Sequence, residues 1–254
     1  MSHYGDIITV KNQKRKLFLT HAYGYAGAIS MRLRSRSGHE DLLQWIDLNS
    51  EEYLRIISRP QKKSLLHYLI HDLALSDWGH EITHWKLNQL EDFFRAHDET
   101  IPRKLKNWTE GNSDKLWNRL ERPLKKLEDA TFHLLFGDRN TLLNFNKMLA
   151  GKVVLLGPDD HSSFKKQGVL KRPTYIPTWL RKAIFHRDQG RCQLCQRDLT
   201  GLINPLTDQE FDHLWPLAKS GTNDPTNFQL LCKSCNRTKS AGEGKTGAFH
   251  YTYW

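Results

Sequence analysis

The sequence predicts an α+β protein in two parts, a mostly helical N-terminal domain and a small C-terminal domain stapled by a metal. Between about residues 40 and 150, apolar residues recur with the 3.6-residue period of amphipathic helices. All four cysteines lie in two Cys-x-x-Cys pairs near the C-terminus. The stretch joining these regions contains the glycines, prolines and basic residues of a connection. We therefore expect a helical domain at 1–155, a basic linker at 156–177 and a C-terminal domain at 178–254.

Composition favours a folded protein that acts on a polyanion. The 254 residues are 38% hydrophobic and 11% aromatic, enough for a packed core. Thirty-eight Lys and Arg against 28 Asp and Glu give a net charge of +10, which indicates a nucleic-acid partner. No apolar run approaches the roughly 20 residues of a membrane span, and the N-terminus lacks a signal-peptide core. With every cysteine in a Cys-x-x-Cys pair, no disulfide framework is expected, which fits a reducing, cytoplasmic compartment.

The first 37 residues predict a small β element. Two apolar patches flank the polar run K-N-Q-K-R-K, as in a hairpin. The run M-R-L-R-S-R then alternates, so that Arg32, Arg34 and Arg36 would share one strand face. That face is either simply solvated or a strip that contacts phosphates.

Residues 40 to 150 predict four or five amphipathic helices packed on one another. Pro60 and Pro102 fall between the apolar segments, as helix stops do, whereas Pro123 falls inside one and marks a helix start or a kink. After these helices, the run G-K-V-V-L-L-G at 151–157 is compatible with a short strand. We expect this domain to supply targeting, through a protein or ribonucleoprotein partner, and not chemistry.

One helical segment carries a competing metal motif. The stretch His80-Glu81-x-x-His84 satisfies H-E-x-x-H, the pattern that binds zinc on a helix with glutamate as the base of a metalloprotease. A second pair, His67 and His71, has the same spacing of four. No third ligand follows at a diagnostic spacing, and a chain with 13 histidines produces such matches by chance. The alternative is two polar positions on a helix face.

The two Cys-x-x-Cys pairs predict a structural zinc site. The sequence reads C-Q-L-C at Cys192 and Cys195, and C-K-S-C at Cys232 and Cys235. Two intervening residues let both thiolates of a pair reach one tetrahedral ion, and four thiolates leave no open position for catalysis. Any chemistry must therefore use polar residues that the two pairs hold between or beside them.

Those polar residues occur in a recognisable order. The run F-D-H-L-W-P-L contains Asp212 and His213, and N-F-Q-L-L-C-K-S-C-N-R-T-K contains Asn227 and Asn236. With the lead-in R-K-A-I-F-H-R-D-Q-G-R-C, the stretch from about 178 to 243 resembles the HNH endonuclease family, whose fold is the ββα-metal module. Because several chemical types fall in register, the resemblance is much more specific than a lone Cys-x-x-Cys.

The resemblance and the chemistry together imply roles for these residues. His213 is expected to be the general base that deprotonates water, since imidazole titrates near neutral pH. Asp212 and Asn236 offer the oxygen ligands that Mg²⁺ or Mn²⁺ prefers. By resemblance, Asn227 shapes the loop and orients the base.

Basic residues around the motif are expected to contact DNA phosphates, although a charge run is often only a solvated face. The candidates are Lys239, Arg237, Arg191, Arg187, Lys171 and Arg172.

The predicted function is a metal-dependent DNA endonuclease. The resemblance is compatible with restriction, with phage defence, or with a nuclease subunit of a larger complex such as a CRISPR-type one. The principal alternative is a non-catalytic, zinc-dependent nucleic-acid-binding adaptor, and a zinc protease is a further one. If the division of labour is right, a fragment that starts near Pro173 retains weak, non-specific nicking.

Overall fold

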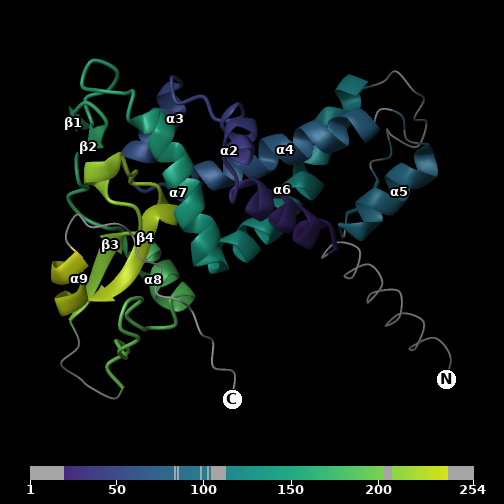
Figure 1. Cartoon of the computed structure of the whole chain (residues 1–254). Coiled ribbons are helices and arrows are strands. Elements are labelled where there is room, and N and C mark those ends of the chain that lie inside the picture. The colour runs from purple at the N-terminus through teal and green to yellow at the C-terminus, as the bar shows by residue number, and fades with distance from the viewer. Residues whose placement is uncertain are drawn as a thin grey trace, which may run out of the picture. The chain divides into compact units, whose positions relative to one another are not determined.

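The computed structural model describes residues 20–239 apart from residues 83, 85, 98, 102, 104–112 and 203–207, and leaves the side chains of 79–82 and 113–119 undescribed. The predicted α+β class is confirmed: the N-terminal part is helical and the C-terminal part contains a small antiparallel sheet (Figure 1). The hairpin predicted around K-N-Q-K-R-K and Pro102 lie outside the described residues. None of the helices in the described part combines the length and apolar character that a membrane crossing requires.

By its internal contacts the chain divides into two compact units that interleave along the sequence. The first contains the chain up to Met31 together with Leu66–Leu135. The second contains Arg32–Leu65 together with the chain from Phe136 onward. The boundaries of these units differ from those of the predicted domains. The boundaries at 155 and 177 stay a prediction, because compactness alone does not define a part that folds by itself.

Helices form the first unit. After a helix at residues 20–32 come α4 (Leu65–Ile82), which begins at the last residue of the second unit, α5 (Leu87–Ala96) and α6 (Ser113–Gly137), which ends in the second unit. Their apolar faces meet in one buried cluster: Ala22, Ala74, Leu90, Phe93, Phe94, Leu120, Leu124 and Leu127. Each fully buried leucine or phenylalanine contributes roughly 1.5–3 kcal/mol of transfer free energy.

The second unit combines helices with the C-terminal sheet. Before the C-terminal elements it contains α2 (Arg36–Leu43), α3 (Glu51–Ser58) and α7 (Arg139–Val153). Asp138 caps α7 by accepting hydrogen bonds from the amides of Asn140 and Thr141. Lys152 near the end of α7 donates to the carbonyl oxygens of Leu43 and Ile46, which ties α7 to the chain after α2.

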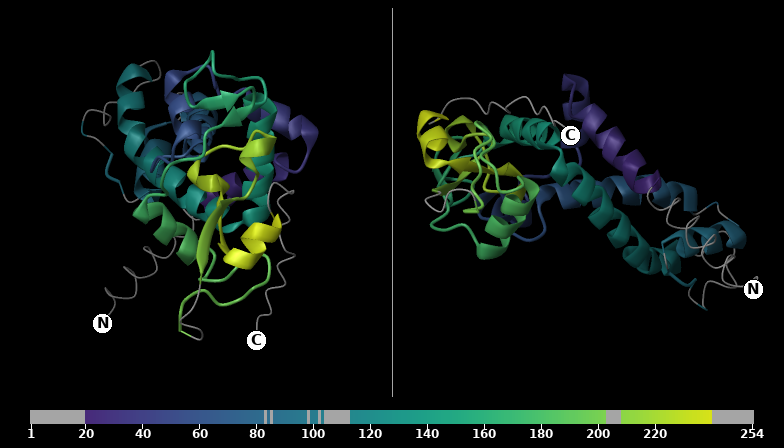
Figure 2. Two further views of the ribbon diagram at one scale, coloured as in Figure 1. Left: turned by 90° about the vertical axis from the view of Figure 1, so that its left-hand side faces the viewer. Right: turned by 90° about the horizontal axis from the view of Figure 1, so that it is seen from below.

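The remainder of the second unit carries the small β elements. Strands β1 (Phe164–Lys166) and β2 (Val169–Leu170) form a hairpin inside the predicted linker. Helix α8 (Thr178–Arg187) packs on strand β4 (Phe228–Cys232), which pairs with β3 (Gln209–His213) and leads directly into α9 (Lys233–Lys239). The left view of Figure 2 shows α9 beside this two-stranded sheet. The core between α8 and β4 includes Leu180, Ile184, Phe228, Leu230 and Leu231.

Two local predictions are wrong. Residues 20–32 are helical and Arg36 begins α2, so the three arginines share no strand. The buried positions Ala22, Ala26, Ile29 and Leu33 show why, since their spacing of three to four is that of a helix.

The other error also reflects helical periodicity that outweighs a local signal. The run at 151–157 forms no strand, because α7 continues to Val153 and keeps its buried face there. Of the two expectations for Pro123, a helix start is excluded, because this residue lies inside the 25-residue helix α6, and a kink stays a prediction. Pro60, by contrast, lies between α3 and α4 as predicted.

Candidate functional site

The sequence-predicted catalytic residues converge on one end of the β3–β4 sheet. Asp212 and His213 end β3, opposite Gln229 and Phe228 of β4, and both side chains are buried. β4 is buried at every position, and all its residues except Gln229 are apolar, as in strands covered on both faces. A pocket of about 420 Å³ lies at this end of the sheet. It is lined by Arg172, Asp212, His213, Pro216, Leu217, Ala218, Asn236, Arg237 and Lys239.

The imidazole of His213 is held by Asn223. Its Nε2 lies 2.9 Å from the side-chain oxygen of Asn223. The amide nitrogen of Asn223 donates to the carbonyl oxygens of Ser58 and Lys171, each at 2.9 Å. Because a carbonyl oxygen can only accept, these two contacts fix which way the amide faces. The oxygen of Asn223 must then accept from His213, so Nε2 carries the proton.

That tautomer leaves Nδ1 of His213 as the basic atom. Nδ1 is buried and has no hydrogen-bond partner among the described residues. The pKa of His213 is lowered to about 4, mainly by burial; the cations Arg172 and Lys239 act in the same direction, and Asn223 and Asp212 oppose them. The ring is therefore neutral at pH 7 and presents a lone pair that can accept a proton.

The carboxylate of Asp212 lies among cations. Lys239 Nζ donates to its Oδ2 at 2.6 Å and to the carbonyl oxygen of His213 at 2.8 Å. Arg172 approaches the other oxygen at 3.8 Å. Asn236 lines the same pocket and donates to Glu210 at 3.4 Å. An anionic carboxylate and an amide oxygen at one pocket fit the oxygen donor set of a hard divalent cation.

Asn227 shapes the loop that follows β3 and does not contact the imidazole. Its side-chain oxygen accepts from the amide of Trp215 at 2.7 Å, and its nitrogen donates to the carbonyls of Trp215 and Thr222. Within this loop, an added Cβ at Gly221 would lie 2.3 Å from the Trp215 carbonyl oxygen, so only glycine fits. The loop-shaping contacts expected of Asn227 are present, while the contact to the base histidine comes from Asn223.

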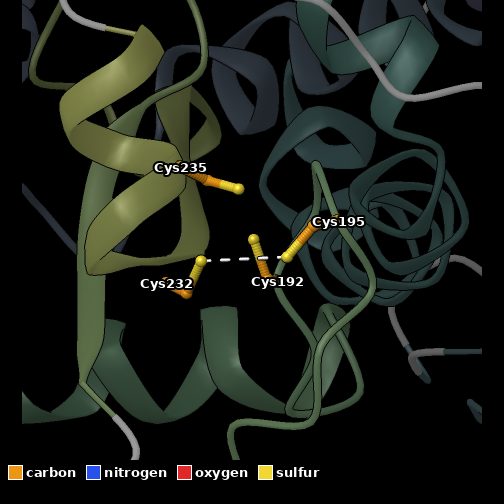
Figure 3. Close-up of side chains that lie close together, drawn as sticks. All are labelled: Cys192, Cys195, Cys232 and Cys235. Carbon is orange, nitrogen blue, oxygen red and sulfur yellow. Dashed lines mark hydrogen bonds between the residues drawn. The ribbon is translucent and has the colours of Figure 1, made fainter.

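The four cysteines are positioned to form a zinc site. Figure 3 shows Cys192 and Cys195 on one loop facing Cys232 at the end of β4 and Cys235 on α9. Their sulfur atoms all lie within 4.8 Å of one another, and those of Cys195 and Cys232 are 3.8 Å apart. Tetrahedral zinc with bonds of about 2.3 Å places its sulfurs about 3.8 Å apart, so the geometry fits the ion.

The ionisation of these thiols fits the same site. Burial raises the pKa values of Cys195 and Cys235. Burial also opposes ionisation of Cys232, but hydrogen bonds from Ser234 and Cys235 prevail and lower its pKa to about 6. Four thiolates this close repel one another unless a cation lies between them, so metal binding must release protons.

The predicted DNA-contacting residues fall into three groups. Arg172 and Arg237 are exposed and line the pocket. Lys171 and Arg191 are exposed but do not line it. Arg187 and Lys239 point inward, with side chains only 3% and 4% exposed.

Arg187 has a structural position. Its guanidinium pairs with Asp188, donates to the carbonyl oxygen of Phe228 and lies over the ring of Phe136. Asp188 in turn accepts from the amide of Leu230 in β4. We therefore do not retain Arg187 as a phosphate contact, because its charge already holds α8 to the sheet.

Sequence reasoning missed the residues that connect this site to the helices of the same unit. Asp224 is fully buried and accepts from the amides of Leu65 and Thr226. Burial raises its pKa, against those hydrogen bonds. Arg139, at the start of α7, is buried and donates to Gln193 of the zinc loop and Gln229 of β4. The polar run T-N-D-P-T-N was the available signal, because asparagine and aspartate in a turn commonly bond to nearby backbone.

The two histidines of the H-E-x-x-H motif do not both lie in one helix, as zinc binding by this motif requires. Helix α4 ends at Ile82, so His84 lies beyond the helix that contains His80, and it is exposed. The side chains of His80 and Glu81 lie outside the described residues. A zinc protease needs both imidazoles on one helical face, which this helix end does not provide.

The sheet, the pocket and the zinc cluster together define a zinc-stapled ββα nuclease module. Residues 192–242 match the family model described as HNH endonuclease. The chain thus carries an HNH endonuclease domain at its C-terminus, and such domains are metal-dependent nucleases. Neither the curated proteins nor the solved structures include a match to the chain.

Proposed function

We propose that this chain is a DNA endonuclease that hydrolyses phosphodiester bonds with His213 as the general base. The observation that carries the proposal is the fixed tautomer of His213, which leaves its Nδ1 without a hydrogen-bond partner among the described residues. His213 lines the same pocket as Asp212 and Asn236. A neutral imidazole in that position can take a proton from water as it attacks phosphorus. Because Nε2 donates to Asn223, the ring keeps Nδ1 available between turnovers.

The donor set of the pocket supports a hard divalent cation, Mg²⁺ or Mn²⁺. Asp212 and Asn236 would hold it, and it would supply Lewis-acid stabilisation of the charge on the phosphate and the leaving oxygen. Lys239 keeps the Asp212 carboxylate in place by bonding both to it and to the backbone of His213. These contacts make Lys239 a positioning residue in this proposal, instead of the phosphate contact first expected.

Positive charge near the pocket supports a nucleic-acid substrate. Arg172 and Arg237 line the pocket and are exposed. Trp215, next to the lining residue Pro216, has the ammonium groups of Lys147 and Lys219 at 5.3 and 5.8 Å from its ring centroid. Both lysines are exposed. We propose that these four cations contact the DNA backbone on either side of the scissile phosphate.

Plasmid nicking tests the proposal against the non-catalytic adaptor. Purified protein should nick supercoiled DNA with Mg²⁺ or Mn²⁺ and stop in EDTA. Asp212→Ala should lose the metal-stimulated activity and keep its zinc and its DNA binding, since the two metals use different residues. DNA binding without cleavage under any divalent ion would instead support the adaptor. The setting, whether restriction, phage defence or a larger complex, remains a prediction from the resemblance alone.

A further inference from the structure

The first unit contains a second group of side chains that could hold a metal ion, His67, Glu128 and Asp129, with His71 beside it. His67 and His71 lie four residues apart on α4, so their imidazoles share one helical face. On α6, Glu128 and Asp129 face them: the ligand atoms of His67, Glu128 and Asp129 all lie within 4.8 Å of one another. His71 Nδ1 is 3.3 Å from Glu128 Oε2.

The scaffold around this cluster is well ordered by packing. Ala74 of α4 and Leu124 and Leu127 of α6 belong to the buried core of the unit. The ring of His67 stacks on Phe132 of α6 with centroids 3.6 Å apart, which fixes its plane. Helices held by a common core are rigid supports for a ligand set.

The cluster contains a buried carboxylate with a half-exposed lysine beside it. The Glu128 side chain is only 1% exposed, and a buried carboxylate is costly without a compensating cation. Lys125 supplies that cation, at 2.9 Å from Glu128 and 2.7 Å from Asp129. The side chain of Lys125 is half exposed, so its ammonium group can move into water, whereas the buried Glu128 carboxylate cannot.

We propose that His67, His71, Glu128 and Asp129 form a binding site for a divalent transition metal, with Lys125 as a displaceable substitute cation. Two imidazoles with carboxylates are a donor set for zinc, manganese, iron, cobalt or nickel, whereas magnesium and calcium prefer oxygen alone. The alternative is an ion-pair network that joins α4 to α6 without metal. The site is separate from the nuclease chemistry and does not depend on it.

Metal stoichiometry in the full chain tests the site. The background is Asp212→Ala, so that the nuclease pocket contributes no ion. After equilibrium dialysis against zinc, elemental analysis should give two ions per chain, one in the cysteine site and one here. The His71→Ala variant should bind one ion. Because the His71 side chain is partly exposed, this substitution should disturb the fold little. His84→Ala is the matched control, because it removes an exposed histidine of the same region and of the H-E-x-x-H motif.

Lys125→Ala separates metal binding from the ion-pair alternative. Removing a competing cation should increase the affinity for the second ion by roughly threefold or more, the scale of one or two partly exposed ion pairs. A metal-free network would instead show one ion per chain in every variant. One ion in the parent protein, a second ion that survives His71→Ala, or loss of the second ion in His84→Ala would each overturn the proposal.

Discussion

At the scale of single residues, the site depends on one amide. The side chain of Asn223 donates to two backbone carbonyls and accepts from His213, so it fixes both the plane and the tautomer of the ring. Its own backbone amide donates to the carbonyl of Ile57 at 2.7 Å. The sequence could indicate His213 through the motif, but not Asn223, because its three side-chain partners are 10, 52 and 165 residues away.

Replacing Asn223 should therefore impair catalysis more than folding. Asn223→Ala should lower the nicking rate by about 10- to 100-fold, the usual cost of losing a group that orients a reactive one. Asn223→Asp should not recover that loss, since its second carboxylate oxygen cannot donate to the Ser58 and Lys171 carbonyls as the amide nitrogen does. Nitrogen NMR of labelled histidine should show the Nε2–H tautomer in wild type and a mixture in Asn223→Ala.

The exposed Asn140 on α7 provides the control, and Asn140→Ala should behave as wild type in both assays. If Asn223→Ala kept the wild-type rate and tautomer, the ring would be held by something other than this amide.

At the scale of elements, periodicity and spacing were the reliable signals. The helical character of residues 40–150 and the zinc cluster were predictable because each follows a local repeat or a fixed separation, although the described part of this range has six helices, α2 to α7, in place of four or five. The errors at residues 32–36 and 151–157 arose where a short β-like pattern overlapped the end of a helix. Burial of every third or fourth residue prevailed at both places, because packing outweighs local propensity.

The zinc site should hold the β3–β4–α9 element together. Cys192→Ser with Cys235→Ser should remove the single structural zinc measured by elemental analysis in chelator-treated protein. Hydrogen exchange should then show lost protection in β3, β4 and α9, while the helices of the first unit stay protected, since binding energy at such sites is folding energy. Unchanged zinc content in this double variant would show that the cysteines do not bind it.

The end of α5 should make stability depend on pH. Burial lowers the pKa of His97 to about 4, against its hydrogen bond to the Phe93 carbonyl. The unfolded chain binds this proton below about 6.5 and the folded chain only below about 4. As the pH is lowered from about 6.5 to about 4, the free energy of unfolding should therefore decrease by up to about 3 kcal/mol. Above about pH 6.5, His97 should not affect its pH dependence.

Urea unfolding of His97→Asn measures this contribution. The substitution keeps a donor for Phe93 but removes the titrating ring, so the stability difference from wild type should shrink as pH falls from 7 to 4. The exposed His133 offers a control, and His133→Asn should stay parallel to wild type. A constant difference for His97→Asn across this range would mean that His97 does not titrate on unfolding.

At the scale of the whole molecule, the nuclease module is built into its compact unit and is not appended to it. The segment that holds His213 and Asn227 bonds to α3, to the residue that begins α4, and to α7 through Asn223, Asp224 and Thr226. The HNH motif alone could not predict this, since a local pattern carries no information on which distant backbone covers it.

This arrangement changes the outcome expected for a fragment that starts near Pro173. The fragment lacks α3, α7 and Leu65, so the buried Asn223, Asp224 and Gln229 lose partners at about 1–3 kcal/mol for each buried polar group. We now expect it to bind zinc but to nick plasmid at least tenfold more slowly than the full chain, and to unfold at lower denaturant. A fragment with the wild-type nicking rate would show that these contacts are dispensable.

The rate of plasmid nicking by His213→Ala is the most direct test of the account. Measured with saturating Mg²⁺ between pH 6 and 8, with zinc content and DNA binding as controls, the variant should be slower than wild type by about 10² or more, the scale of a lost general base. Zinc content and DNA affinity should not change, because His213 is buried and is neither one of the zinc-binding cysteines nor one of the exposed cations. A variant that nicks at the wild-type rate at pH 7 would contradict the assignment of His213 as the base.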